Sequence, residues 1–311
     1  MTTLTLRRLG AALAGGLALA LTCSACNRQQ KPQAAAPPRS EPTVILVADT
    51  GLSSPESVLY DSVADTYLVS NINGSPLDKD NNGYITVLSP DGKVVTPRFI
   101  AGGEKGVTLN APKGMGLVKG VLYVADLDTV RMFDRKTGAA KGEVAIPGAT
   151  FLNDIAVSGE RVFVSDSGLK GGAKGFEPSG TDAVYELAKG KAEAIAKGDA
   201  LGRPNGLCAD GGKVHVVTFG TNELYRLEKG EKVDVVKLPK GSLDGLIDLG
   251  KGEHLISSWE SEVVYKLDAR GNATEVIKSV KAPADLGWDS KRKRVLVPRF
   301  MDNKVEVFEL K

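Results

Sequence analysis

The sequence predicts an all-β fold, a six-bladed β-propeller with four-stranded blades that is closed by an N-terminal strand. Short β segments separated by Gly, Asp, Asn and Lys turns fill the chain from Thr43 onward. A short motif recurs before these segments, and the second residue of one motif is 57, 40, 52, 39 and 40 residues from that of the next. A period near 40 residues with four short strands per unit is typical of a propeller. The sixth unit ends after three strands, and the segment T-V-I-L-V-A-D at 43–49 can supply the fourth.

The first 42 residues are predicted to lie outside the propeller. Residues 1–25 combine Arg7 and Arg8 with a short apolar run and small residues, as an export signal does. Cys26 follows C-S-A and resembles the lipidated cysteine of a bacterial lipobox, although Cys23 stands where Leu is usual. Residues 26–42 form a Pro/Ala/Gln-rich tether. We therefore expect a periplasmic lipoprotein anchored through Cys26, with simple secretion as the alternative.

Composition limits the partners of the propeller, expected over 43–311. The formal net charge of +2 gives no general attraction to nucleic acid or to an anionic membrane, so membrane contact is expected only through the lipid anchor. Cys208 is the one cysteine of the body, so no disulfide is available there. We expect a monomer that acts on a small molecule.

The second position of each motif marks a candidate metal site. In a propeller these positions start the innermost strands, so they converge at one mouth of the axis; they are Glu56, Lys113, Asn153, Asn205, Asp244 and Ala284. Four of them carry side-chain oxygens, which suit a hard divalent cation, most simply Ca²⁺. The alternative is that these residues only cap the strand starts. Lys113 shares the register, and its side chain can swing outward, pair with the carboxylates or take the place of the cation.

These motifs resemble those of the SMP-30/gluconolactonase/LRE-like superfamily of six-bladed propellers. P-N-G-L at 204–207 and L-D-G-L at 243–246 are the best local matches. The resemblance implies that Glu56, Asn205 and Asp244 are metal ligands and that Asn153 is a fourth ligand or a substrate contact. Two departures affect the substrate: Ser57 follows Glu56 where Gly-Pro is usual, and Phe151 stands where sugar lactonases often have Arg. The sequence is therefore as compatible with a more apolar substrate as with a sugar lactone.

Two classes of function follow. The first is a calcium-dependent hydrolase of a lactone or related ester, in which the ion acts as a Lewis acid and Asp244 or Glu56 as general base or nucleophile. Lys113, Asn153, Phe151 and Trp259 are its predicted substrate contacts. The second is a non-enzymatic periplasmic propeller that binds a ligand or protein partner, with a structural metal or none.

The remaining candidate residues have simpler interpretations. His215 and His254 fall within predicted strands and, like Cys208, are interpreted as packed residues. Neither histidine lies in one of the repeated motifs, which makes zinc at the mouth less favoured than calcium. Trp259, Phe300 and Met301 lie on connections at the mouth and can line a pocket or fill gaps between blades.

The stretch D-K-D-N-N-G at 78–83 begins like an EF-hand loop. Position twelve is Ser89 instead of Glu, and the flanks are β-like, which excludes that motif. We predict a hairpin tip ending in an Asn-Gly turn on the Glu56 face. A lid, or a second cation site at Asp78, Asp80 and Asn82, is the alternative.

Overall fold

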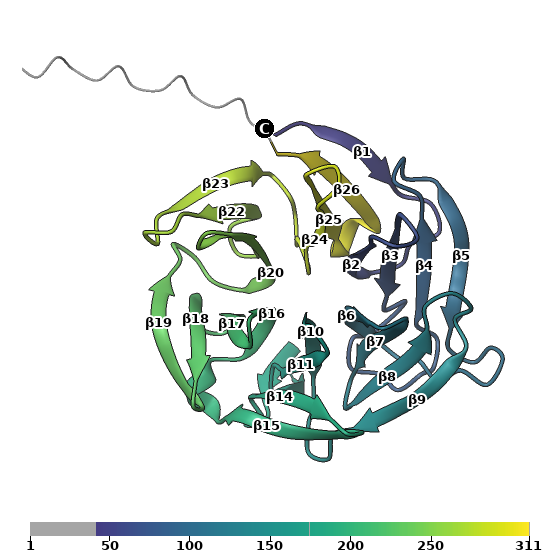
Figure 1. Ribbon diagram of the computed structural model, residues 1–311, viewed down its shortest axis with the longest axis horizontal. Helices are drawn as coiled ribbons and strands as arrows, with labels where there is room; N and C mark the ends of the chain where they lie inside the picture. Colours follow the sequence, from purple (N-terminus) through teal and green to yellow (C-terminus); the bar gives the residue numbers. More distant parts are fainter. Residues whose placement is uncertain (1–41, 174, 311) are drawn as a thin grey trace, which may run out of the picture. The chain divides into compact units, whose positions relative to one another are not determined.

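Six four-stranded antiparallel sheets surround one axis in the computed structural model, which describes residues 42–173 and 175–310 (Figure 1). Each blade is a meander that runs from the axis outward. Blade 1 contains β2 (Pro55–Asp61), β3 (Thr66–Asn71), β4 (Tyr84–Leu88) and β5 (Val94–Ala101). Blade 2 contains β6 (Pro112–Val118), β7 (Val121–Asp126), β8 (Thr129–Asp134) and β9 (Ala140–Ala145). Blade 3 contains β10 (Leu152–Ser158), β11 (Arg161–Asp166), β14 (Ala183–Ala188) and β15 (Lys191–Lys197).

The second half of the ring repeats this order. Blade 4 contains β16 (Pro204–Asp210), β17 (Lys213–Thr218), β18 (Glu223–Glu228) and β19 (Glu231–Lys237). Blade 5 contains β20 (Leu243–Gly250), β21 (Glu253–Ser258), β22 (Val263–Leu267) and β23 (Ala273–Lys278). Blade 6 contains β24 (Gly287–Asp289), β25 (Arg294–Arg299), β26 (Lys304–Glu309) and, at its outer edge, β1 (Val44–Ala48).

The core lies between the blades. The second strand of each blade carries at least one aliphatic residue with no exposed surface. Among these are Val69, Val124, Val164, Val216, Ile256 and Leu296. Each of these side chains stabilises the ring by about 1.5–3 kcal/mol through burial. The same apolar register in all six blades explains why the sequence repeats so regularly.

The N-terminal strand closes the ring, as the sequence predicts. β1 pairs antiparallel with β26, with Val44 opposite Phe308 and Ala48 opposite Val305. On the inner side, Asp285 N of blade 6 donates to Glu56 O of blade 1 at 2.9 Å. The first and last blades are therefore joined at both the outer and the inner end of the seam, which leaves no open edge there.

Two insertions extend the loops at the mouth. The first lies in blade 3 and forms a hairpin of β12 (Leu169–Gly172) and β13 (Gly175–Pro178). The second is the connection from β3 to β4 in blade 1. It lacks the predicted tight Asn82-Gly83 turn, because Asn81 is the residue with positive φ (55°) and its side chain and backbone bond to Leu109 and Asn110 of blade 2.

The expected export signal at 1–25, Cys26 and nearly all of the tether at 26–42 lie outside the described residues. Within the described part of the chain, no helix is long and apolar enough to cross a membrane.

Candidate functional site

The second motif residues reach the axis because their strands are irregular at that point. In five blades the strand pairing shifts register directly after the first motif residue; the shifts fall at Pro55/Ser57, Pro112/Met115, Leu152/Ile155, Pro204/Leu207 and Leu243/Leu246. A bulge of this kind redirects a side chain, and bulges are frequent beside active sites. The register explains why one position of the repeat supplies the site.

A cavity of about 260 Å³ opens at this mouth, and five motif residues form its polar part. They are Glu56, Lys113, Asn153, Asn205 and Asp244, one from each of blades 1 to 5. The predicted substrate contacts Phe151 and Trp259 line the same cavity. Ala284, the sixth motif residue, is fully buried and offers no polar group. The structure therefore brings together every predicted metal and substrate residue.

Three buried oxygens at this cavity have no hydrogen-bond partner among the described residues. They are Glu56 Oε2, Asn205 Oδ1 and Asp244 Oδ1. A buried polar atom left unpaired costs about 1–3 kcal/mol, so three in one place need an explanation. Carboxylate and amide oxygens are the ligands that Ca²⁺ prefers.

Neighbouring groups fix the direction of these side chains. Trp259 Nε1 donates to Asp244 Oδ2 at 2.7 Å, which leaves Oδ1 as the free oxygen. Asn153 Nδ2 donates to Ser167 Oγ at 3.0 Å, so its Oδ1 is the atom left for a ligand. Ser167 Oγ in turn donates to Pro204 O of the next blade at 2.7 Å. The orientation of the polar floor is therefore set before any ligand arrives.

The carboxyl groups at the axis are held close to protonation. Burial, and then the charges of Asp244 and Asp285, raise the pKa of Glu56 well above its usual range. Burial raises the pKa of Asp244 to about 7, against the opposing hydrogen bond from Trp259. Ionised carboxylates this crowded need either protons or a cation to balance their charge.

Lys113 is buried within the site, with 1% of its surface exposed, so of the three possibilities for its side chain the outward swing is excluded. Its Nζ donates to Ala111 O at 3.0 Å and lies 4.4 Å from the centroid of the Phe151 ring. In the described part of the chain no carboxylate oxygen is within ion-pair distance of Nζ. Burial lowers the pKa of Lys113 to about 8, and the charge of Glu56 opposes that shift.

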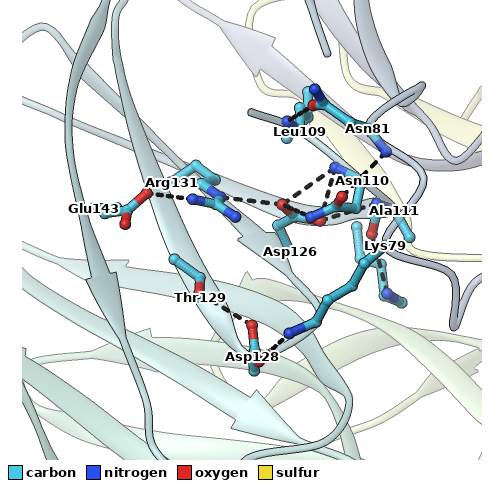
Figure 2. Close-up of polar contacts among 11 residues, drawn as sticks. Lys79, Asn81, Leu109, Asn110, Ala111, Asp126, Asp128, Thr129, Arg131 and Glu143 are labelled. Atoms are coloured by element: carbon cyan, nitrogen blue, oxygen red, sulfur yellow. Dashed lines mark hydrogen bonds and ion pairs between the residues drawn. The ribbon is translucent and has the colours of Figure 1, made fainter. Parts of the chain in front are cut away.

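Asp126, the last residue of β7, fixes the turn at Asn110 and Ala111 (Figure 2). The carbonyl of Ala111 accepts a hydrogen bond from the Lys113 ammonium. The Asp126 carboxylate accepts hydrogen bonds from Asn110 N at 3.1 Å, Ala111 N at 2.9 Å and Arg131 Nε at 3.1 Å. Asp166 of blade 3 is its counterpart and accepts from Phe151 N at 2.9 Å. The last residue of the second strand thus positions the start of the first strand in both blades.

Aromatic side chains form the wall of the cavity. Phe176, from the blade 3 hairpin, packs edge-on against Phe151 with ring centroids 5.6 Å apart. Trp259 lies between Phe219 and Phe300, at centroid distances of 6.1 and 5.4 Å. The cavity therefore combines a small charged floor with a large apolar wall, as ligand pockets commonly do.

Comparison with known proteins gives a clear result for structure and none for sequence. No protein-family model matches the chain, and no curated protein matches it. A structure assigned to the gluconolactonases is 18% identical, with a TM-score of 0.63 over 88% of this chain and 93% of its own. A gluconolactonase from Xanthomonas campestris is 15% identical, with a TM-score of 0.63 over 87% and 95%. Virginiamycin B lyase from Staphylococcus aureus is 13% identical, with a TM-score of 0.57 over 87% and 99%.

The chain is a six-bladed propeller that matches gluconolactonases in structure. The predicted resemblance is thus confirmed for the fold. These structural neighbours are enzymes, both lactonase and lyase, so the fold is found with more than one chemistry.

Two acidic residues of this gluconolactonase-like propeller escaped the sequence interpretation. Asp154 and Asp285 each follow the second motif position by one residue, and both are buried. Asp154 Oδ2 accepts from Leu207 N at 2.6 Å, and Asp285 Oδ2 accepts from Ser57 Oγ at 2.5 Å. Burial raises the pKa of Asp154 to about 6 and that of Asp285 well above its usual range.

The sequence signal for these two acids is that they stand at the third motif position, where glycine is the commonest residue. Three blades have Gly114, Gly206 and Gly245 there, and a Cβ on any of them would come within 2.1–2.3 Å of a neighbouring atom. An acid at a position where three of the six blades have glycine is a signal for a second polar layer. That layer adds negative charge near Glu56 and Asp244.

The donor set fits a calcium ion. Glu56, Asn205 and Asp244 each present one buried unpaired oxygen, and Asn153 lines the same cavity. Four carboxyl groups converge at the axis with one buried ammonium, so a divalent cation would reduce the net charge that burial makes costly.

Proposed function

We propose that this protein is a calcium-dependent hydrolase of a lactone or related ester with an apolar body. The observation that carries the proposal is the set of three unpaired buried oxygens, Glu56 Oε2, Asn205 Oδ1 and Asp244 Oδ1, at the floor of an aromatic cavity. These three residues would hold the ion, with Asn153 assisting. When bound, the ion would supply a Lewis acid that polarises the ester carbonyl.

Asp244 is the candidate for general base or nucleophile. Its Oδ2 is held by Trp259, so Oδ1 faces the cavity in a fixed direction. A carboxylate in a fixed orientation is effective both in taking a proton from water and in attacking a carbonyl directly. Glu56 also presents a free oxygen, but no side-chain donor holds its second oxygen in the described structure.

Lys113 is the candidate for binding the developing negative charge on the substrate. Phe151 occupies the position at which sugar lactonases often have Arg, and the ammonium of Lys113, from the adjacent blade, lies over its ring. Lys113 of blade 2 therefore supplies a positive charge close to position 151 of blade 3, where the resemblance predicts an arginine. With a pKa of about 8, this ammonium can donate a hydrogen bond or a proton to a leaving alkoxide near neutral pH.

The wall of the cavity favours an apolar substrate over a polyhydroxy sugar lactone. Phe151, Phe176, Phe219, Trp259 and Phe300 surround the charged floor, and an aliphatic or aryl group would bury its surface against them. Sugar hydroxyls placed against these rings would lose their hydrogen bonds to water without replacement.

A substrate panel tests the proposal. Alkyl lactones, a sugar lactone, aryl esters and phosphotriesters are each assayed with calcium and with EDTA, for the wild type and for Asp244→Asn. We expect turnover of apolar lactones or aryl esters that EDTA abolishes and that the variant lacks. A protein that binds calcium at this site but turns over none of these compounds would instead be a ligand-binding propeller.

A further inference from the structure

A second cluster of metal-ligand side chains lies between blades 4 and 5. Cys208, His215 and His254 each offer one ligand atom, and these atoms all lie within 4.8 Å of one another. Cys208 and His215 are cross-strand neighbours on β16 and β17. His254 lies on β21 of the next blade, with its ring centroid 5.3 Å from that of His215. The sequence interpretation of three separate packed residues is therefore incomplete, because blade packing brings them together.

Asp248 provides a fourth functional group beside this cluster. It is the cross-strand partner of His254 on β20, so two facing pairs, Cys208 with His215 and Asp248 with His254, meet between the blades. The charge of Asp248 acts on the titration of all three other groups. Its Oδ1 accepts from Gly250 N at 2.7 Å, so Oδ2 is the oxygen left for another partner.

The cluster is distinct from the calcium-type site at the mouth. β16 and β20 begin at the mouth with Asn205 and Asp244, whereas the cluster residues lie near the opposite ends of the strands. Cys208 is two residues from Asp210, where the hairpin to β17 begins. The two sites therefore use opposite ends of the same two blades.

Three buried imidazole nitrogens lack hydrogen-bond partners within the described structure. His254 is only 7% exposed, yet neither of its ring nitrogens has a hydrogen-bond partner there. His215 Nδ1 is also buried and unpaired. Burying an unsatisfied polar atom costs about 1–3 kcal/mol, and a leucine or valine at either position would avoid that cost. Unpaired imidazoles beside a thiol are suited to binding a metal ion.

We propose that Cys208, His215 and His254 bind a zinc ion that links blades 4 and 5, with Asp248 as the fourth group. A thiolate and two imidazoles suit zinc and disfavour calcium or magnesium, which take oxygen ligands. Ligand atoms around a tetrahedral zinc are about 3.3–3.6 Å apart, so side-chain rotations that shorten the separations among the Cys208, His215 and His254 ligand atoms by up to about 1.5 Å bring these three to zinc distances. Three ligands and a carboxylate match the four-coordinate geometry of structural zinc.

Zinc uptake here would release a proton. Burial, and then the charge of Asp248, raise the pKa of the Cys208 thiol, so without metal the sulfur carries its proton. Zinc binds the thiolate, and the thiol proton passes to solvent as the Zn–S bond forms. Zinc affinity should therefore increase with pH.

Metal binding to the full chain tests this proposal. The sequence has three cysteines, so Cys208 becomes the one thiol when Cys23 and Cys26 are replaced by Ser. His215 and His254 are its two histidines. Zinc content after dialysis is measured by atomic spectrometry, affinity by competition with a chromophoric chelator, and sulfur ligation by the thiolate charge-transfer band of the cobalt-substituted protein. We expect one zinc per chain and a cobalt–thiolate band, both retained in Asp244→Asn.

Variants then assign the ligands. Cys208→Ser and His215→Gln should each weaken zinc binding by about 100-fold or more, and Cys208→Ser should abolish the cobalt–thiolate band. Asp248→Asn should weaken binding by about 10- to 100-fold. Asp210→Asn is the matched control, because it removes a nearby carboxylate from the exposed end of β16 and should leave binding unchanged. Circular dichroism confirms that each variant is folded. Zinc binding that survives Cys208→Ser unchanged, or a folded parent chain that takes up no zinc, would refute the site.

Discussion

Replacing Asp244 with Asn should stabilise the calcium-free protein and abolish its response to calcium. Asp244 is fully buried beside Glu56, and its pKa rises from 3.8 to about 7. A carboxyl group whose pKa is higher in the folded than in the unfolded chain costs stability once it is ionised. Asparagine has nearly the same shape, keeps an oxygen for Trp259 Nε1 and carries no charge.

The size of the effect follows from the pKa. At about 1.4 kcal/mol per pKa unit, holding Asp244 ionised costs the fold about 4 kcal/mol at pH 8. At pH 5 the folded protein keeps the proton, and the cost is about 2 kcal/mol. The sign is set by proton binding: the folded chain binds more protons than the unfolded chain, so its stability falls as pH rises from about 4 to about 7. Asp244→Asn should remove this slope.

Denaturant unfolding with and without calcium is the assay, at pH 5 and pH 8. Saturating calcium at 100 times its Kd should stabilise the wild type by about 2.7 kcal/mol and the variant by nothing measurable. Asp61→Asn is the control: the same change is made at a buried carboxylate that is fully paired, with Arg135 at 2.8 Å and with two backbone amides. That variant should be destabilised and should respond normally to calcium. A calcium response in Asp244→Asn equal to that of the wild type would refute the reasoning.

Three further predictions concern the site and the seam. Lys113→Met removes a buried ammonium whose pKa near 8 corresponds to a burial cost of about 3 kcal/mol; calorimetry should show tighter calcium binding, and weaker binding would mean that the ammonium helps to organise the site. Trp259→Phe removes the donor to Asp244 Oδ2, so calcium binding should weaken by about 10- to 100-fold, the value of a hydrogen bond to a charged group; unchanged affinity would show that Asp244 is oriented without it. A chain that begins at Gly51 lacks β1 and exposes the edge of β26, so sedimentation should detect self-association, whereas a stable monomer would contradict the closure.

The sequence predicts the ring and the polar floor because both follow from the repeat. One register recurs in every blade, so the residues at Glu56, Asn205 and Asp244 are placed at the axis without knowledge of any contact. The closing strand follows from counting strands, because three at the C-terminus and one at the N-terminus complete a blade. The repeat alone therefore predicts which residues, far apart in the sequence, come together at the axis.

The sequence fails where a contact depends on one side chain or on the packing of two blades. Lys113 has several staggered rotamers, and only the neighbouring Phe151 ring and the Ala111 carbonyl select the buried one. Asp154 and Asp285 occupy a position that is glycine in three blades, so the repeat does not predict an acid there. The Cys208 cluster combines strands of two blades, and no pattern along the chain shows which faces of adjacent blades meet.

The pairing of β1 with β26 has a mechanical consequence. Val44 lies opposite Phe308, so the start of β1 and the end of β26 are at the same end of the seam. A pulling force applied between the two chain ends would load the hydrogen bonds of this seam one after another, as in unzipping, and would not shear them all at once. The ring should therefore open at low force. Because Ser57 of blade 1 donates to Asp285 of blade 6, opening the seam would also separate the carboxyl groups at the axis, and tension on the chain ends would release a bound cation.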